Sequence, residues 1–435
     1  MKQLGSFDTI IKSFHQILES LPDKRTGKNI RYGIEDAALS AFSVFFTQTP
    51  SFLAYQRTME KTKGRSNAQS LFGVHKIPSD NHIRDLLDPA QPEQIFPVFE
   101  QILQMLDRER HLDKLRNFDD NLLIAIDGTE YFSSSQIHCP QCSTRTMKSG
   151  ETHYFHSVVT PVVVNPQQTQ VIPLIPEFIV PQDGKEKQDC ETSAAKRWLL
   201  KHGQKYSPLR ITVLGDDLYS RQPLCQMLLE QKCNFILVCR PESHQTLYEH
   251  LEGIKLPTVI TTRWTGKLTE TSTYRYLNQV PLKNEDEALL VNWCEVTVTK
   301  PDGKIVYKNS FATNHRITEE TVAAIVLAGR TRWKVENENN NTLKTKGYNL
   351  EHNFGHGKQH LASFLVTLNI LSLLFHTLLE LMDAKYQLLR RHLPTRKTFF
   401  DDLRALTRYL YFDSWDALLS FMIHGLELEL PPNSS

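Results

Sequence analysis

The pattern of apolar positions divides the chain into a helical start, a middle of alternating strands and helices, and a helical end. Over residues 1–115 apolar side chains recur at helical spacing, most clearly at 37–47 and 94–106. From residue 121, short continuous apolar runs replace this spacing, which predicts buried strands. The runs that predict strands are 122–127, 155–164, 169–180, 210–217 and 234–240, and helices are expected at 189–202 and 221–231.

Three strands in succession, followed by strands that alternate with helices, are typical of the ribonuclease H-like topology. Residues 241–315 break this alternation and predict a β-rich insertion, with a hairpin turn at Pro301-Asp302-Gly303. A long helix is then expected from an N-cap at Thr318 to about Lys346, with Gly347 as C-cap. We therefore expect an α/β fold: a ribonuclease H-like mixed sheet with a β-rich insertion, flanked by N-terminal and C-terminal helical regions.

This pattern predicts five regions along the chain. They are a helical region 1–115, the first part of the core at 116–240 with a Cys-x-x-Cys loop at 133–152, the insertion 241–315, the last part of the core at 316–385, and a C-terminal helical region 386–435.

Composition narrows the class of protein. The 435 residues are 40% hydrophobic and 23% charged, which argues against a disordered, collagenous or disulfide-stapled chain. The net charge is +1, so any nucleic-acid binding must come from local basic patches. Seven cysteines and no signal-peptide pattern predict free thiols in a reducing cytosol. The most apolar stretch, 364–382, contains Asn369, His376 and Glu380, which favours a buried core helix over a membrane span.

Two aspartates stand at the ends of predicted strands. Asp127 ends the run 122–127, and Asp216 ends the apolar part of 210–217, ahead of its competitor Asp217. Carboxylates at the tips of neighbouring strands repel each other unless cations lie between them, and Mg²⁺ prefers oxygen ligands. Each acid alone is more often a turn residue or a helix cap, and it is their joint placement at the ends of these elements that favours catalysis.

A third acid is expected from the helix predicted at 318–346. Arg332, Glu336, Asn340 and Lys344 fall on roughly one face of it. Glu336 and Glu338 would point about 200° apart, so only one of them can face the strand ends. Two metals about 4 Å apart, held by such acids, would clamp the oxygens of an in-line displacement. Arg332 and Lys344 would then hold phosphate oxygens.

Three blocks of the chain resemble insertion-sequence DDE transposases: DGTEYFSS, GDDLYSR and RTRWKVENENNNTLKTKGYNLEHNFGHG. In that family an Arg-Trp-x-(Ile/Val)-Glu signature carries the third acid, which favours Glu336 over Glu338. The lysine expected about seven residues later is displaced by one position, to Lys344, and Gly329 stands where the family has tyrosine. The resemblance covers about residues 30–385 and includes the β-rich insertion.

The resemblance implies a DNA transposase that hydrolyses and rejoins DNA phosphodiesters with Mg²⁺ or Mn²⁺ held by Asp127, Asp216 and Glu336. It also implies double-stranded DNA partners, namely element ends and target, and a homodimer assembled on DNA, with no role for a membrane. The N-terminal helical region and the insertion would read the element ends. A catalytically inactive DNA-binding protein with the same fold is the alternative.

A Cys-x-x-Cys knuckle at Cys139 and Cys142 is followed by His153 and His156. Two thiolates in a tight turn with two imidazoles nearby suit tetrahedral Zn²⁺, and the two cysteines are the best candidate ligands. The alternatives are two free thiols in a polar loop, and a His156 directed at the acidic site. For His352, His356 and His360, solvent, phosphate contact or core packing is favoured over a metal.

Basic stretches supply candidate phosphate contacts. The polar connection that contains Lys61, Lys63 and Arg65 is expected to reach the DNA backbone. A solvated loop with no role is the alternative.

Overall fold

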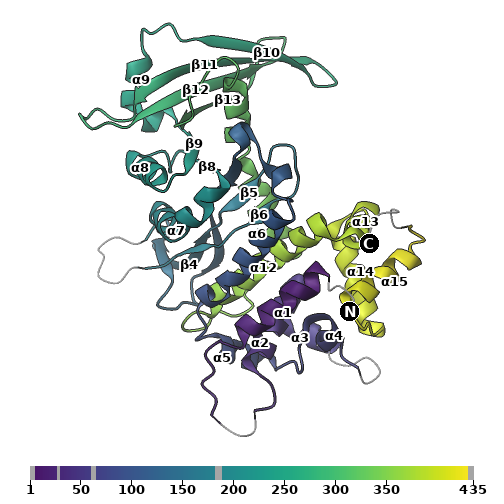
Figure 1. Ribbon diagram of the computed structural model, residues 1–435. Helices are drawn as coiled ribbons and strands as arrows, with labels where there is room; N and C mark the ends of the chain where they lie inside the picture. The colour runs from purple at the N-terminus through teal and green to yellow at the C-terminus, as the bar shows by residue number, and fades with distance from the viewer. Residues whose placement is uncertain (1–4, 27–29, 60–64, 182–188, 430–435) are drawn as a thin grey trace.

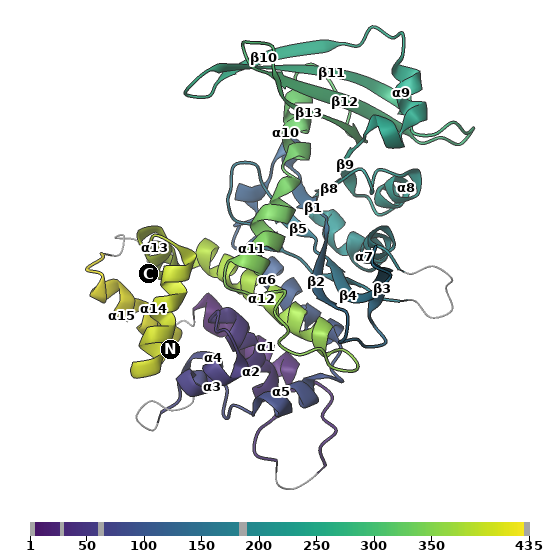
Figure 2. The same ribbon diagram turned by 180° about the vertical axis from the view of Figure 1, so that it is seen from behind.

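Nine strands form one continuous mixed sheet along the molecule, in the order β10-β11-β12-β13-β9-β8-β1-β5-β6. The computed structural model describes residues 5–26, 30–59, 65–181 and 189–429. Figures 1 and 2 show the long strands at one end of the molecule, the short core strands in the middle and the N-terminal and C-terminal helices at the other end. The protein is therefore a mixed α/β fold with a large sheet and flanking helices.

The core of this sheet contains five short strands, β1 (Leu122–Ala125), β5 (Val162–Val164), β6 (Ile172–Pro173), β8 (Ile211–Gly215) and β9 (Asn234–Val238). The β1–β5 and β5–β6 pairs are antiparallel, whereas β8 pairs in parallel with both β1 and β9. Every residue of β1, β5 and β8 is buried, as the continuous apolar runs predicted.

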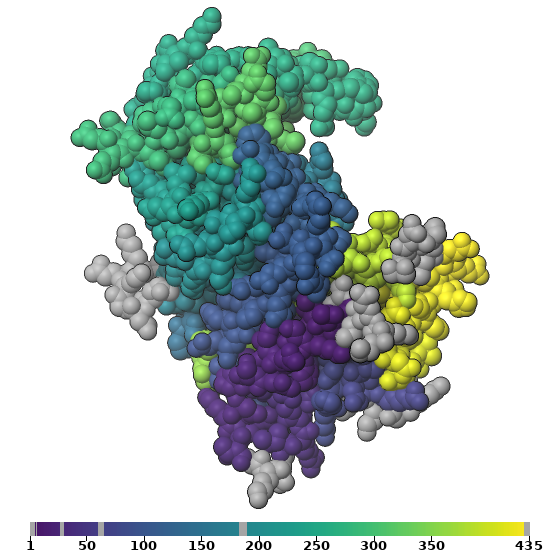
Figure 3. All heavy atoms as spheres, in the orientation of Figure 1, coloured from purple at the N-terminus to yellow at the C-terminus, as the bar shows by residue number. Residues whose placement is uncertain are grey.

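The β-rich region extends the same sheet. It consists of β10 (Thr258–Trp264), β11 (Thr269–Pro281), β12 (Leu290–Thr299) and β13 (Ile305–Thr313), with the helix α9 (Gln245–Leu251) packed against β11. Because β13 pairs with β9, these strands continue the core sheet. They form one end of the molecule in the space-filling view of Figure 3.

A second sheet is formed by the chain segment that connects β1 to β5, together with one strand that follows β6. It contains β2 (Gly128–Ser134), β3 (Ser143–Thr146), β4 (Thr152–Val159) and β7 (Glu177–Ile179). The apolar runs 155–164 and 169–180, each expected as one strand, therefore divide between the two sheets. Prolines explain the divisions, because Pro161 lies between β4 and β5, and Pro176 lies between β6 and β7, and proline has no N–H for the strand ladder.

Helices cover both faces of the core sheet. The first face packs against α7 (Glu191–Tyr206) and α8 (Gln222–Glu230), and its buried cluster joins Ile124 and Val213 to Trp198. The opposite face packs against α10 (Val322–Arg330), where Leu123 and Leu214 share a cluster with Ile325.

The remaining helices form the other end of the molecule. Six come from the N-terminal region: α1 (Ser6–Leu18), α2 (Ile34–Phe46), α3 (Phe52–Met59), α4 (Asn67–Phe72), α5 (Asp80–Leu87) and α6 (Phe96–Arg108). Four lie towards the C-terminus, after α11: α12 (Leu361–Met382), α13 (Ala384–His392), α14 (Arg396–Tyr409) and α15 (Trp415–Gly425). Short 3-10 turns lie at Pro92–Ile95, Asp113–Leu115, Phe118–Asp120, Ser207–Leu209 and Pro241–Ser243.

The long apolar helix α12 is the centre of this helical end. It packs against α1, α2, α6 and α13, which the views of Figures 1 and 2 also show. Among the described residues α12 is the one helix long and apolar enough to cross a membrane, and 89% of its most apolar window is buried inside the protein. The prediction of a buried core helix is confirmed.

The single helix expected from residue 318 to 346 is interrupted. It consists of α10, a turn at Thr331–Arg332, a π-helical turn at Val335–Asn340 and α11 (Asn341–Thr345). Asn340 is buried, and its Oδ1 accepts hydrogen bonds from Thr160 Oγ1 at 2.7 Å and Asn339 Nδ2 at 2.9 Å. The bond from Thr160 attaches the widened turn to the connection between β4 and β5, in the segment that carries the candidate third acid.

Candidate functional site

Asp127 and Asp216 lie side by side at one edge of the core sheet. Their strands β1 and β8 are parallel neighbours in which Ala125 pairs with Leu214, and each aspartate stands two residues beyond its member of that pair. Both aspartates are half-buried. Sequence reasoning placed them at adjacent strand ends, and the structure has them there.

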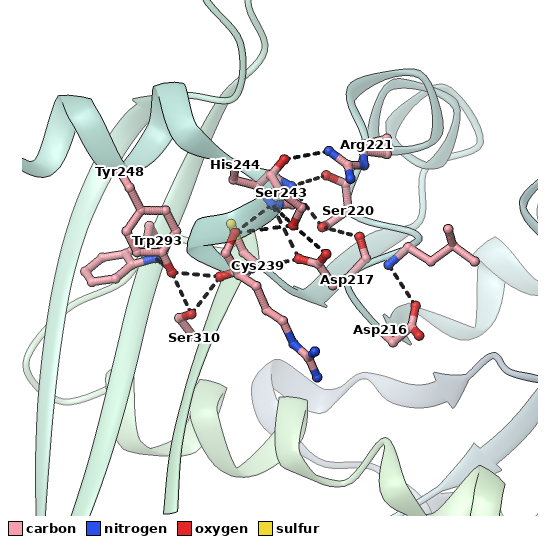
Figure 4. A network of polar contacts seen from close by, with 12 residues as sticks. Asp216, Asp217, Ser220, Arg221, Cys239, Ser243, His244, Tyr248, Trp293 and Ser310 are labelled. Carbon is pink, nitrogen blue, oxygen red and sulfur yellow. Dashed lines mark hydrogen bonds and ion pairs between the residues drawn. The ribbon is translucent and has the colours of Figure 1, made fainter.

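Asp216 and Asp217 have different surroundings, which Figure 4 shows. Asp217 accepts hydrogen bonds from Arg240 N at 2.7 Å and from the Ser243 hydroxyl, and lies 3.4 Å from His244 Nδ1. Asp216 accepts one hydrogen bond, from Leu218 N at 2.9 Å. Asp217 is therefore engaged in holding the loop after β9, whereas Asp216 keeps an oxygen available beside Asp127.

The two candidate third acids, Glu336 and Glu338, point in different directions from the π-helical turn. Glu336 is exposed, and its carboxylate lies 4.0 Å from the Arg332 guanidinium. The negative charge of Glu336 contributes to raising the pKa of Asp127. Glu338 instead lines a cavity of about 710 Å³ together with Arg396 and Lys346. This geometry favours Glu336 as the acid that accompanies the two aspartates.

Burial and the neighbouring carboxylates both raise the pKa of Asp127. Burial raises its pKa to about 7, and the negative charges of Glu191, Asp216 and Glu336 act in the same direction. Arg332 opposes this shift. Asp127 therefore lies in a region where negative charges outnumber the positive charge of Arg332, and a bound cation would lower its pKa.

Glu191 is the member of this group that sequence reasoning missed. It is the first residue of α7, and its Oε1 accepts hydrogen bonds from Gly128 N at 2.8 Å and from the Tyr219 hydroxyl at 2.5 Å. An acid in the first turn of a helix is common for reasons of helix electrostatics alone. The sequence therefore carried no signal that set Glu191 apart.

The basic residues predicted to contact DNA have varied settings. Arg332 stands beside Glu336, whereas Lys344 forms an ion pair with Glu351 at 2.8 Å. Arg65 stacks over the Tyr411 ring, 5.1 Å from its centroid. Lys61 and Lys63 lie outside the described residues.

A second cluster of ligand-type side chains lies on the four-stranded sheet. Cys139, Cys142, His156 and His356 each offer one ligand atom, and these atoms all lie within 4.8 Å of one another. The cluster could hold a metal ion. Hydrogen bonding from Cys142 lowers the pKa of Cys139, so one thiolate forms readily in the pair.

The spacing of the four atoms matches a tetrahedron. With Zn–S about 2.3 Å and Zn–N about 2.0 Å, a regular tetrahedron places two sulfurs about 3.8 Å apart and each sulfur about 3.5 Å from each nitrogen. The Sγ atoms of Cys139 and Cys142 are 3.9 Å apart. Nε2 of His156 lies 3.5 Å from Sγ of Cys139 and 3.4 Å from Sγ of Cys142. Nε2 of His356 lies 3.6 Å from the second sulfur.

His153, expected as a ligand, is not part of the cluster. It lies on β4 three residues before His156, and residues an odd number apart on a strand point to opposite faces. Its Nε2 lies 3.7 Å from Glu151 instead. The fourth member is His356, for which the sequence favoured solvent, phosphate or core packing. Because 214 positions separate it from Cys142, local spacing could not identify it.

Aromatic rings surround the two imidazoles of the cluster. Tyr131 stacks on His156 with centroids 5.5 Å apart, and Phe132 packs on His356 at 4.4 Å. Because these rings restrict rotation, the imidazole nitrogens are already directed at the sulfurs.

The sequence matches no model of a known protein family, and no curated protein matches it.

Proposed function

We propose that this protein is a DNA transposase of the DDE type, which cuts and rejoins DNA phosphodiesters with Mg²⁺ or Mn²⁺. The observation that carries the proposal is the position of Asp127 and Asp216 at the ends of neighbouring parallel strands, where burial and the charges of Glu191, Asp216 and Glu336 raise the pKa of Asp127 to about 7. Such a group of carboxylates is suited to divalent cations that bind phosphate.

The strand order supports a ribonuclease H-like core for this function. Three antiparallel strands, β6, β5 and β1, precede the parallel strands β8 and β9 in the chain order and pairing that this fold requires. The helix α8 connects the parallel strands β8 and β9. The candidate third acid follows α10, which packs on the face of the sheet opposite to α7 and α8.

The roles of the chain's own residues follow from their positions. Asp127, Asp216 and Glu336 would hold the cations, which would supply an activated water and neutralise the charge on the attacked phosphate. Arg332, beside Glu336, would bind a non-bridging phosphate oxygen. Lys344 would do the same once it leaves Glu351.

We infer that the metal of the sulfur and nitrogen cluster is zinc. Two thiolates and two imidazoles are a ligand set of structural zinc sites, and the sulfur–sulfur distance and three sulfur–nitrogen distances fit a tetrahedron of that ion. Mg²⁺ is a hard cation that prefers oxygen, so it does not suit this cluster. Metal analysis of protein purified without chelator tests this inference, and we expect about one zinc per chain.

The partners of the proposed enzyme are the DNA ends of the element, the target DNA and a second copy of the chain assembled on DNA. All seven cysteines are free, which fits a reducing cytosolic compartment.

The deciding experiment uses duplex DNA that carries the sequences flanking the coding region. We expect strand cleavage that depends on Mg²⁺ or Mn²⁺ and is lost in Asp127→Asn. Metal-independent binding without cleavage would favour the alternative, a DNA-binding protein that retains the fold without catalysis. If the protein neither binds nor cleaves this DNA, the proposal is overturned.

A further inference from the structure

Glu191 connects the two strand ends that carry Asp127 and Asp216. Its Oε1 accepts the N–H of Gly128, the residue after Asp127, at 2.8 Å. The same oxygen accepts the hydroxyl of Tyr219, which lies three residues after Asp216, at 2.5 Å. One carboxylate oxygen therefore bridges the two segments in which the candidate catalytic aspartates lie.

The approach of Glu191 to Gly128 is unusually close. A Cβ atom at position 128 would lie 2.6 Å from Cδ of Glu191 and 2.7 Å from its Oε2, so any larger residue would displace the carboxylate. The absence of a side chain at position 128 therefore allows the carboxylate to lie against this backbone.

The helix that carries Glu191 is firmly attached to the core. Arg197 of α7 hydrogen-bonds Glu177 at 2.9 Å and Asp189 at 2.8 Å, and Trp198 Nε1 donates to Ile175 O at 2.9 Å. Tyr219 is fully buried, with 1% of its surface exposed. The helix that carries Glu191 and the ring of Tyr219 are thus held by contacts that do not involve Asp127 or Asp216.

We propose that Glu191 is a positioning residue, which fixes the separation of Asp127 and Asp216 through the Gly128 N–H and the Tyr219 hydroxyl. This proposal rests on the proposed cation site between the two aspartates. Groups that hydrogen-bond next to metal ligands orient those ligands, and their removal typically costs about 10- to 100-fold in metal affinity or activity. Glu191 acts in this way on the backbone next to Asp127 and on the side chain of Tyr219 in the segment that follows Asp216.

Tyr219→Phe is the sharpest test, because it removes one hydroxyl of the bridge and changes no charge. Mn²⁺ binding to the intact DNA-free protein would be measured by electron paramagnetic resonance. We expect affinity to fall about 10-fold in Tyr219→Phe and further in Glu191→Ala. Glu230→Ala, at the exposed end of α8, is the matched control and should bind as the wild type.

Glu191→Gln separates positioning from charge, since a glutamine carbonyl can accept both hydrogen bonds. At saturating Mn²⁺ this variant should cleave DNA within a few-fold of the wild type, whereas Glu191→Ala should remain slow. Wild-type Mn²⁺ affinity in both Tyr219→Phe and Glu191→Ala would overturn the proposal. Equal losses in Glu191→Gln and Glu191→Ala, with Tyr219→Phe unchanged, would also overturn it, because Glu191 would then act through its charge or as a ligand.

Failure of the proposed function has a different signature. A wild-type protein that binds Mn²⁺ through Asp127 and Asp216 but cleaves no DNA would remove the transposase assignment, and the DNA-free affinities would still decide the role of Glu191. Thermal midpoints of all variants show whether each protein is folded, and Tyr219→Phe keeps the proposal testable if Glu191→Ala does not fold.

Discussion

Nε2 of His356 lies 3.6 Å from Sγ of Cys142, although 214 positions separate the two residues in the chain. The segment that carries His356 is also attached to α5, because Asp88 accepts hydrogen bonds from the N–H groups of Lys358 and Gln359. A metal at the cluster would therefore join the four-stranded sheet to the segment that follows α11, next to the N-terminal helices.

The first prediction concerns the ligands of this metal. Cys139→Ser and His356→Ala should each reduce the zinc content well below one per chain after dialysis against chelator, because each removes one of the four protein ligands and weakens zinc binding. His153→Ala is the matched control and should retain zinc, since its imidazole lies 3.7 Å from Glu151 and outside the cluster. Elemental analysis decides the outcome. Loss of zinc in His153→Ala with retention in His356→Ala would contradict the assignment.

The second prediction concerns the three acids of the proposed cation site. Asp127→Asn, Asp216→Asn and Glu336→Gln should each reduce DNA cleavage to background while DNA affinity stays close to that of the wild type. The substitutions preserve the shape of each side chain and remove one cation ligand. Cleavage and binding would be measured on the same end-containing duplex. Normal cleavage by Asp127→Asn would refute the role of this site.

The third prediction separates Glu336 from Glu338. Glu338→Gln should keep most of the cleavage activity, since Glu338 lines the cavity shared with Arg396 and Lys346. Glu336→Gln should not, since its charge acts at Asp127. Paired rate measurements on the two variants are sufficient. The reverse order of activities would move the third acid to position 338.

Much of the site could be predicted from the sequence, because its strongest signals are local. Asp127 and Asp216 end continuous apolar runs, and such runs become neighbouring buried strands with their ends at one edge. His356 and Glu191 could not be found in this way. His356 reaches the cluster by tertiary packing, and Glu191 looks like an ordinary acid at a helix start. The division of the run 155–164 between two sheets depends on Pro161, whose effect on strand pairing the apolar pattern does not show.

The fourth prediction concerns pH and the metal-free protein. The pKa of Asp127 is about 7 in the folded state, above the usual value near 3.8, because of burial and the neighbouring carboxylates. Between about pH 4 and 7 the folded protein therefore holds a proton that the unfolded chain has lost, so the free energy of unfolding falls as pH rises through this window. Asp127→Asn should lack this decrease and should be the more stable protein at pH 8. Denaturant unfolding at pH 5 and pH 8, with chelator present, measures both slopes. Identical pH slopes in wild type and variant would mean that Asp127 ionises freely.

The last prediction concerns the ion pair between Lys344 and Glu351, whose charged atoms lie 2.8 Å apart. Lys344 is about three-quarters buried along its side chain, whereas Glu351 is largely exposed, so the glutamate is the partner that can move away. If Lys344 binds a DNA phosphate, it must exchange Glu351 for that phosphate. Glu351→Gln should therefore strengthen DNA binding, because it removes the competing carboxylate and leaves the lysine charged.

Lys344→Ala should weaken binding across DNA sequences and reduce the slope of log affinity against log salt by about 0.9. Affinities at several salt concentrations for the wild type and both variants provide the test, with Lys346→Ala as a neighbouring control on the cavity side of α11. An unchanged slope in Lys344→Ala, with unchanged affinity in Glu351→Gln, would show that this pair only stabilises the segment after α11. The phosphate contacts would then have to come from Arg332 or from the region around Arg65.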